Sequence, residues 1–165
     1  INEVLRKALE LRAYELRTGN IELDVELAPN LPKIVADFGQ IQQVFLNIIL
    51  NAEQAMTEAN QGGRLTVKTQ PGKGCIRISL ADDGPGIPVG NLNRIFDPFF
   101  TTRGEKGGTG LGFSACHGIV TEHGGRIYAK SKPGQGATFF IELPLTDEET
   151  GESKVNEEKP VHSRR

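Results

Sequence analysis

Cysteine is scarce in this sequence, whose 165 residues include only Cys75 and Cys116. The two lie far apart, one in a strand-like run and one in a helix-like run, and neither has a CxxC or CxxxH neighbour. This spacing does not support a disulfide framework or a thiolate metal site. Both cysteines are interpreted as small buried hydrophobic side chains.

Long apolar runs and an excess of one charge are also missing. No stretch approaches the ~20 apolar residues that cross a bilayer, and the first residues, INEVLRKALE, lack the basic-then-apolar order of a signal peptide. The formal net charge of -2 gives no electrostatic reason to expect nucleic acid or an anionic membrane as a partner. We therefore expect a cytoplasmic domain without direct membrane contact, whatever anchor a longer parent protein carries.

Periodic apolar residues predict both helices and strands. Helical spacing is found in residues 1–18, 37–58 and 111–123, and alternation typical of strands in residues 21–27, 64–70, 75–83 and in two runs between 124 and 145. This order predicts an α+β fold, a two-layer sandwich in which helices pack on one face of a mixed, largely antiparallel sheet. The other face of the sheet is expected to be wetter.

The chain divides into one domain and a tail. Residues 1–146 have the size and composition of a single domain. The stretch 147–165 (DEETGESKVNEEKPVHSRR) is highly charged with almost no apolar residues, so we expect a disordered tail or a linker. Residues 84–109 are rich in Gly, Pro, Thr and Phe without a sustained period, which in a compact domain predicts a functional lid.

A stripe of amides runs along the second predicted helix. On a helical wheel these side chains fall within about a quarter turn of one another: Gln40, Gln43, Asn47, Asn51 and Gln54. A solvated face is the alternative, but solvated faces normally use Lys, Glu and Arg, which form helices better than Asn. An amide oxygen is a neutral ligand for a hard cation, so the stripe favours a Mg²⁺ site to which a triphosphate brings most of the negative charge.

Two glycine-rich segments bound the lid. In LADDGPGIP, Asp82 ends a strand, and Gly84 and Gly86 then permit close approach of a ligand. An ionised carboxylate only accepts hydrogen bonds, so Asp82 suits the exocyclic amine of adenine, although an ordinary Asp-Gly turn is the alternative. GEKGGTGLGF leads into a helix, a setting that attracts phosphate. No P-loop motif is present, and the second segment comes too late, without a βαβ unit, for a dinucleotide-binding fold.

Together these segments resemble the ATP-binding catalytic domain of sensor histidine kinases, a fold shared with the ATPase subunit of DNA gyrase and the mismatch-repair ATPases. QIQQVFLNIILNAEQA is similar to the N box of that family, DDGPGIP to its first glycine box, IFDPFF to its F box and GGTGLGF to its second glycine box. GGRIYAKSKPGQGATFFIELP is similar to its closing hairpin. The resemblance runs from about residue 1 to Leu145.

The resemblance implies roles for individual residues. Asn51 corresponds to the asparagine that coordinates Mg²⁺, Asn47 to its companion near the phosphates, and Asp82 to the carboxylate that binds the adenine amino group. Phe96, Phe99 and Phe100 match the F box that anchors the lid. Nucleotide contacts are also implied for Gly84, Gly86, Ile87 and Thr138 around the base, for Phe96 and Phe99 in the F box, for Thr101, Thr102, Arg103 and Lys106 in the lid, and for Gly108, Thr109, Gly110, Leu111 and Gly112 at the phosphates. The catalytic candidates are Asn47, Asn51, Arg103 and Lys106.

Two positions depart from the patterns of the wider family. Hydrolytic members carry a glutamate as general base where this chain has Asn47, which favours phosphoryl transfer over hydrolysis. Many sensor kinases carry Lys or Arg where this chain has Gln54. We expect Arg103 or Lys106 to supply that charge.

The implied activity is phosphoryl transfer from Mg-ATP to a histidine on a separate dimerisation hairpin, with a response regulator as the indirect partner. Two other functions stay open. One is a non-catalytic ATP sensor in which binding only orders the lid, and the other is an anti-sigma-type protein serine kinase. The long lid and the F box favour the histidine kinase.

The chain is predicted not to phosphorylate itself. The acceptor in this family is a histidine followed by an acidic residue, a context that His117, His123 and His162 all lack. Incubation with γ-labelled ATP should leave the chain unlabelled, while a supplied acceptor hairpin takes up acid-labile phosphate. Label on the chain itself would contradict this prediction.

Overall fold

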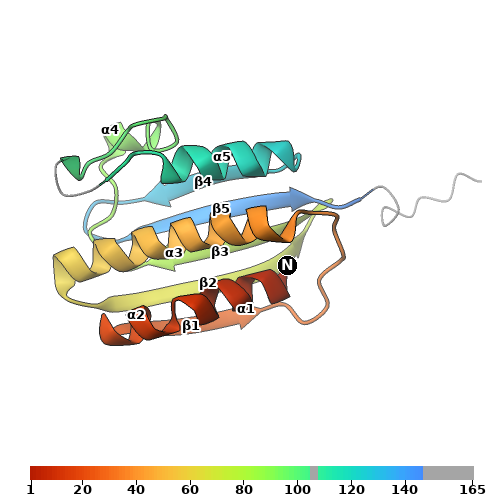
Figure 1. Cartoon of the computed structure of the whole chain (residues 1–165), viewed down its shortest axis with the longest axis horizontal. Helices are drawn as coiled ribbons and strands as arrows, with labels where there is room; N and C mark the ends of the chain where they lie inside the picture. The colour runs from red at the N-terminus through yellow and green to blue at the C-terminus, as the bar shows by residue number, and fades with distance from the viewer. Residues whose placement is uncertain (105–107, 147–165) are drawn as a thin grey trace, which may run out of the picture.

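The computed structural model describes residues 1–104 and 108–146, which form two layers (Figure 1). Helices cover one face of a five-stranded sheet with the strand order β1-β2-β3-β5-β4. This arrangement confirms the α+β two-layer sandwich predicted from the sequence. The predicted tail, residues 147–165, lies outside the described residues.

The sheet combines parallel and antiparallel pairing. β1 (Ile21–Leu27) is an edge strand parallel to β2 (Gly63–Gly72), which pairs antiparallel with β3 (Cys75–Asp82). β5 (Ala137–Pro144) lies between β3 and β4 (Arg126–Ser131) and is antiparallel to both. The end of β3 therefore lies beside the start of β5.

The helices within the described residues are α1 (Asn2–Leu11), α2 (Ala13–Thr18), α3 (Phe38–Asn60), α4 (Val89–Leu92) and α5 (Gly112–Glu122). The periodicity of the sequence does not predict α4, which is a single turn inside the predicted lid. None of the helices in this part of the chain is long and apolar enough to cross a bilayer.

The single helix predicted over residues 1–18 is wrong, because Arg12 interrupts it with φ -108° and ψ 5°. Nη2 of Arg12 lies 2.6 Å from Oε2 of Glu53 on α3. α1 packs on α3, whereas α2 packs on β1. The interruption therefore allows the two halves of one amphipathic segment to pack on different elements. The periodicity of the sequence does not predict this tertiary effect.

α3 is the helix at the centre of the core. Asp37 caps its N-terminus by accepting a hydrogen bond from the Gln40 N–H at 2.8 Å, and Gln61 ends it in the left-handed region with φ 57°. One side of α3 is buried against the rest of the core, through Ile41, Val44, Phe45, Ile48, Ile49, Ala52 and Met56. The amide stripe belongs to a different side of the helix, so it stays available at the edge of this packing.

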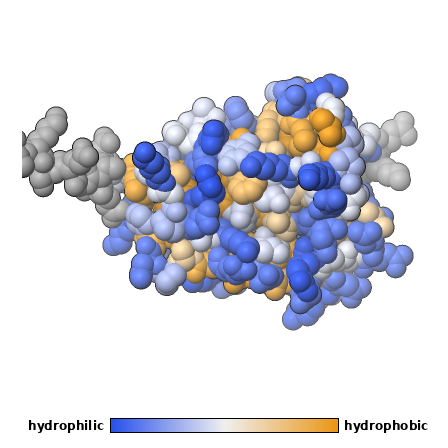
Figure 2. Space-filling view, turned by 180° about the vertical axis from the view of Figure 1, so that it is seen from behind, coloured by the Kyte–Doolittle hydropathy of each residue, from blue (hydrophilic) through white to orange (hydrophobic). Residues whose placement is uncertain are grey.

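The sheet face away from the helices is largely hydrophilic, as predicted, with some hydrophobic patches (Figure 2). Glu142 of β5 accepts hydrogen bonds from Arg77 at 3.0 Å and from Arg126 at 2.9 Å. Phe140 stacks on Tyr128 on the same face, with 5.1 Å between ring centroids. Charged groups and half-buried aromatic rings thus cover this face in place of a second helical layer.

A cluster of aromatic rings joins β5, α5 and the predicted F box. Phe113 of α5 stacks on Phe139 of β5 with ring centroids 4.8 Å apart, and Phe96 meets Phe139 edge-on at 6.5 Å. Phe139 is only 1% exposed. The cluster therefore fixes the first part of the lid to the core.

Phe139→Ala should be severely destabilising, because it removes a fully buried ring from this cluster and leaves a cavity. We expect the free energy of unfolding to fall by about 3–5 kcal/mol. Phe140→Ala, at the next residue of the same strand but on the polar face, is the matched control and should cost much less. Urea unfolding measures both, and equal losses would contradict the central role of Phe139.

Candidate functional site

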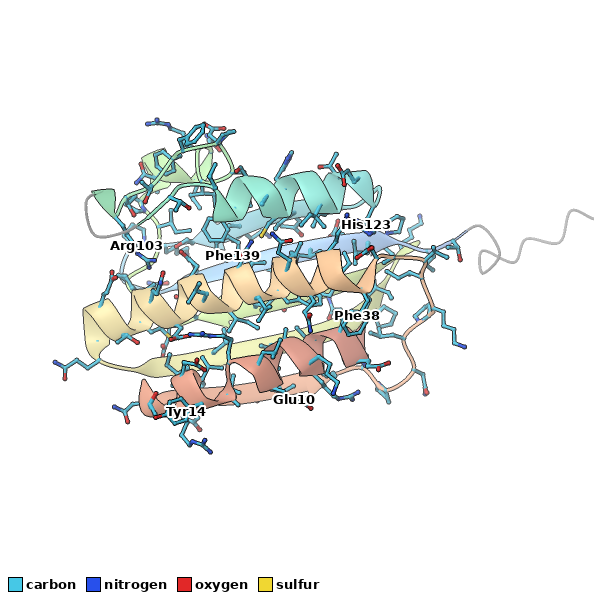
Figure 3. The ribbon with its side chains drawn as sticks, viewed as in Figure 1. Glu10, Tyr14, Phe38, Arg103, His123 and Phe139 are labelled. Atoms are coloured by element: carbon cyan, nitrogen blue, oxygen red, sulfur yellow. The ribbon has the colours of Figure 1, made fainter. Side chains whose placement is uncertain are left out.

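Four segments that are distant in the sequence meet at one end of the sheet (Figure 1). Gly84, just after β3, lies against Met56 of α3. Asn47 of α3 bonds to Gly112 at the start of α5, and Arg103 of the lid reaches the C-terminal half of α3 (Figure 3). The residues predicted to bind nucleotide are therefore brought to one region, on the helix side of the sheet.

Asp82, the last residue of β3, is a nearly buried carboxylate with 8% of its surface exposed. Burial raises its pKa, and the charge of Asp83 adds to that rise, whereas backbone N–H groups of Gly84 and Ala137 oppose it. The Gly84 N–H donates to Oδ1 at 3.0 Å. A hydrogen-bond donor on a bound ligand would find a carboxylate that is shielded from water and already oriented by the Gly84 N–H.

The loop after Asp82 is held by the turn between β4 and β5. Gly86 has φ +79°, and a Cβ there would come within 2.6 Å of the Lys132 carbonyl oxygen. The Ile87 N–H donates to Oγ of Ser131 at 2.7 Å. Ser131 is a supporting residue that the sequence analysis missed, because its partner comes from another part of the chain. The first glycine box is thus a fixed wall and not a free loop.

The strand register corrects one prediction. Ala137 lies opposite Asp82, and Thr138 lies opposite Ala81. Because side chains alternate along a strand, the Thr138 side chain lies on the polar face of the sheet, away from Asp82. Gly136, with φ +78°, lets the turn touch the Asp82 carbonyl, where any Cβ would overlap that oxygen. Ala137 and Gly136 therefore line this corner, and the predicted contact of the Thr138 side chain with the base is wrong.

The amides of α3 have three different environments. Asn47, half-buried, donates to the Gly112 carbonyl at 3.3 Å and lies 3.6 Å from Sγ of Cys116, so it connects α3 to α5. Asn51, one turn later, is half-buried, and its amide has no hydrogen-bond partner among residues 1–104 and 108–146. Gln54, exposed, accepts a hydrogen bond from Arg103. Asn51 is therefore the amide best placed to serve as a ligand.

Both cysteines are free thiols within the described residues, and only Cys116 is buried as the sequence predicted. Cys116 is fully buried between α5 and α3, and burial raises the pKa of its thiol to about 11. Cys75 is half-buried near the turn after β2. At neutral pH the Cys116 side chain therefore stays a protonated hydrophobic group.

Two segments of the lid, residues 99–101 and 108–110, contact each other. The Phe99 N–H donates to the Gly110 carbonyl at 2.9 Å, and both residues have positive φ, 66° and 67°. The close approach of Gly108 to Thr101 leaves no room for a Cβ at Gly108. Phe99 points outward with 74% of its surface exposed, so Phe96, and not Phe99, anchors this segment in the core.

Of the other lid residues predicted to bind nucleotide, the structure describes Arg103 and Thr102. Arg103 donates through its backbone to Oγ1 of Thr101 at 3.1 Å, and its guanidinium contacts Gln54 and Glu58. Thr102 is exposed. Lys106 lies outside the described residues.

The start of α5 provides backbone donors. No side chain caps this helix at Leu111, which is 44% exposed. Thr109 accepts only a long hydrogen bond, 3.4 Å, from the Leu111 N–H. First-turn N–H groups without a side-chain cap, reinforced by the helix dipole, form a favourable place for an anion. They lie next to Asn47, because Asn47 bonds to Gly112.

Comparison with known proteins agrees with this geometry. The profile described as "Histidine kinase-, DNA gyrase B-, and HSP90-like ATPase" matches residues 36–147. The chain is 38% identical over 145 residues to sensor histidine kinase ZraS of Escherichia coli (strain K12), covering 88% of this chain and 30% of ZraS. Sporulation kinase E of Bacillus subtilis (strain 168) is 31% identical over 159 residues, which are 96% of this chain and 21% of that kinase. The chain thus spans less than a third of either relative.

Solved structures show the same fold. The catalytic domain of histidine kinase ThkA superposes with a TM-score of 0.77 at 34% identity, covering 90% of this chain and 94% of that one. Full-length ShkA, solved in complex with AMPPNP, superposes with a TM-score of 0.75 at 31% identity, covering 86% of this chain and 29% of that one.

Fold, site geometry and sequence similarity lead to one class: the chain belongs to the family of histidine kinase-, DNA gyrase B- and HSP90-like ATPases. Within that family it is an ATP-binding catalytic domain of the sensor histidine kinase type, the class that acts in two-component signalling. The resemblance drawn from the sequence boxes is confirmed.

Asp82→Asn should stabilise the nucleotide-free domain at neutral pH. Burial raises the folded-state pKa of Asp82 above its unfolded value, so stability falls as pH rises through the interval between the two values. Above that interval the ionised carboxylate is a net cost, which the variant removes. The variant should therefore have a higher free energy of unfolding at neutral pH, and this gain should shrink as the pH falls.

The matched control is Asp83→Asn, because Asp83 is exposed and its Oδ1 accepts from the Arg64 N–H at 2.8 Å. This control removes only the smaller, Coulombic contribution to the raised pKa of Asp82, so its gain should be clearly smaller than that of Asp82→Asn. Denaturant melts across a pH series measure both variants, and a loss of stability in Asp82→Asn at neutral pH would contradict the burial argument.

Proposed function

We propose that this domain binds Mg-ATP at the described site and donates the γ-phosphoryl group to a histidine on a dimerisation hairpin of a longer sensor kinase. The observation that carries the proposal is the convergence of a buried carboxylate, an amide without a partner among the described residues and an uncapped helix N-terminus. The carboxylate suits the adenine amino group, the amide suits a Mg²⁺ ion carried by the phosphates, and the helix N-terminus suits the phosphate oxygens.

Adenine is proposed to bind against the end of β3. The Asp82 carboxylate accepts a hydrogen bond from the exocyclic amine, a group that guanine does not present at that position. Gly84, Gly86 and Ile87 form the wall, which the turn between β4 and β5 holds in place. A carboxylate buried to this degree gains more from a bound donor than a solvated one does.

The phosphates are proposed to lie between α3 and α5. Backbone N–H groups of the second glycine box, residues 108–112, face the triphosphate at the start of α5. Asn47 supports this arrangement by holding the two helices together at Gly112. The Asn51 amide oxygen would hold Mg²⁺, with phosphate oxygens and water as its other ligands, which suits the absence of a cluster of acidic or histidine ligands in the described part of the chain. When bound, Mg²⁺ neutralises the charge that develops on the leaving phosphate.

The chemistry is an in-line displacement for which this domain positions the donor. An imidazole nitrogen of the acceptor histidine attacks the γ-phosphorus, the bond to the bridging oxygen breaks, and ADP leaves. Asn47 cannot act as a general base for water, so transfer to the histidine is favoured over hydrolysis. A response regulator would then take the phosphoryl group from the histidine, and we place this reaction in the cytoplasm.

The two alternative functions are not favoured. The relatives with the reported identities are sensor histidine kinases or a sporulation kinase, and the solved structures are histidine kinases. An ATP sensor would bind nucleotide without supporting transfer to a supplied hairpin. A serine kinase would yield an acid-stable phosphoprotein in place of an acid-labile one.

Calorimetric titration with ATP and ADP, with and without Mg²⁺, tests the binding site directly. Asp82→Asn should lower adenine nucleotide affinity by at least about tenfold, because it removes the charge and replaces one acceptor oxygen with an N–H donor that cannot accept from the adenine amine. Asn51→Ala should retain binding but lose most of the dependence on Mg²⁺. GTP should not compete with ATP.

Asp83→Asn is again the matched control, since the adjacent carboxylate bonds to the Arg64 backbone and not to ligand in this proposal. It should bind ATP like the unaltered chain. Failure of the unaltered chain to bind adenine nucleotides, or equal losses in the Asp82 and Asp83 variants, would reject the proposed site.

A further inference from the structure

Arg103 connects the lid to α3 across a separation of 49 residues in sequence (Figure 3). Nη1 of Arg103 donates to Oε1 of Gln54, and Nε lies 3.7 Å from Oε2 of Glu58. The Arg103 side chain is 21% exposed, although it comes from a surface loop. Gln54 and Glu58 are four residues apart on one helix and lie on the same face, so both can contact the same guanidinium.

The contact between Arg103 and Gln54 lies on the amide stripe of α3. Gln54 follows Asn51 by about one helical turn on the same face of α3. α3 itself, residues 38–60, contains no Lys, Arg or His. Positive charge beside Asn51 must therefore be brought by another element. Among the described residues, Arg12 pairs with Glu53, whereas Arg103 brings its guanidinium to Gln54, on the same face as Asn51.

The two partners of Arg103 differ in what they do to its charge. The Gln54 carbonyl oxygen is neutral, so it orients the guanidinium without neutralising it. Glu58 is 61% exposed and its contact is longer, so water screens it. A guanidinium carries several N–H donors in one plane, and the two contacts leave others free to bind an anion.

The backbone on the lid side is held as well. The Arg103 N–H donates to Oγ1 of Thr101 at 3.1 Å, in the segment that pairs with Gly108 and Gly110. The side chain is thus held from both ends, by the base of the lid and by α3. Ordering a long side chain before a ligand arrives removes part of the entropy cost of binding.

We propose that Gln54, assisted by Glu58, is a positioning residue that holds Arg103 one turn beyond Asn51, ready to bind the outer phosphates of the nucleotide. This inference rests on the proposed function, because it assumes that the triphosphate lies along Asn51. Gln54 acts through Arg103 and does not itself need to touch the nucleotide. ATP, which carries the γ-phosphate, should depend on the pair more than ADP does.

The test compares affinities for ATP and ADP, both with Mg²⁺, in Gln54→Ala, Arg103→Ala and the double variant. Arg103→Ala should weaken ATP binding by about 10- to 30-fold, in the range of a lost hydrogen bond to a charged group, and ADP binding by less than about threefold. Gln54→Ala should weaken ATP binding by about three- to tenfold with the same selectivity. Its effect should vanish when Arg103 is already alanine, because the two side chains act as one unit.

A charge-relocation variant separates positioning from a general structural effect. Gln54→Lys combined with Arg103→Ala places a cation on α3 itself, and it should bring ATP affinity back to within about threefold of the unaltered chain. Gln70→Ala, which truncates an exposed glutamine on β2, is the control and should change neither affinity. Glu58→Gln should have a smaller effect than Gln54→Ala, since its contact is longer and more exposed.

Nucleotide binding at the site and the positioning role of Gln54 can fail independently. If the unaltered chain binds ATP and Asp82→Asn does not, the nucleotide site stands whatever the Arg103 pair does. The positioning role is then rejected if Gln54→Ala weakens ATP and ADP equally, if its effect is undiminished in the Arg103→Ala background, or if the lysine fails to restore ATP affinity. Absence of adenine nucleotide binding by the unaltered chain would reject both.

Discussion

Packing of α3 across the sheet is the interaction on which the rest of the structure depends. Phe45, Ile48 and Ile49 bury one side of the helix completely, and a rotation about the helix axis would expose them. Because the side chains of a helix have fixed angular spacing, burial of that side also fixes the direction of Asn47, Asn51 and Gln54. The hydrophobic core therefore orients polar groups that contribute little to it.

The other parts of the site are attached to this frame by separate contacts. Asn47 fixes the start of α5, and the pairing of β3 with β5 fixes Asp82 against the turn of the closing hairpin. The aromatic cluster around Phe139 fixes the first part of the lid, whereas the contacts of the second part, as far as its residues are described, are those of residues 108–110 and of Arg103. Among the described residues, the end of the site proposed for adenine therefore has more contacts with the core than the end proposed for the phosphates.

Local patterns in the sequence predicted the main features of this fold. Helical and strand periods located α3, α5 and all five strands, and the glycine boxes located Asp82 and the start of α5. Where prediction failed, the cause was a long-range contact. Arg12, where the helix is interrupted, pairs with Glu53 of α3, and the position of Thr138 depends on strand register, which a shift of one residue reverses. The family pattern indicated Arg103 or Lys106 as the source of charge near Gln54, but the local sequence does not distinguish the bonded Asn47 from Asn51, which has no partner among the described residues.

The buried thiol of Cys116 has a consequence for chemical labelling. Its high pKa and complete burial protect it from alkylating reagents while α5 remains packed on α3. The same thiol touches Asn47 and the Val44 carbonyl, which belong to the opposing helix. Modification of Cys116 therefore requires α3 and α5, between which the phosphates are proposed to lie, to separate. Its rate of alkylation, corrected for the half-buried Cys75, would report how often that gap opens, without any added probe.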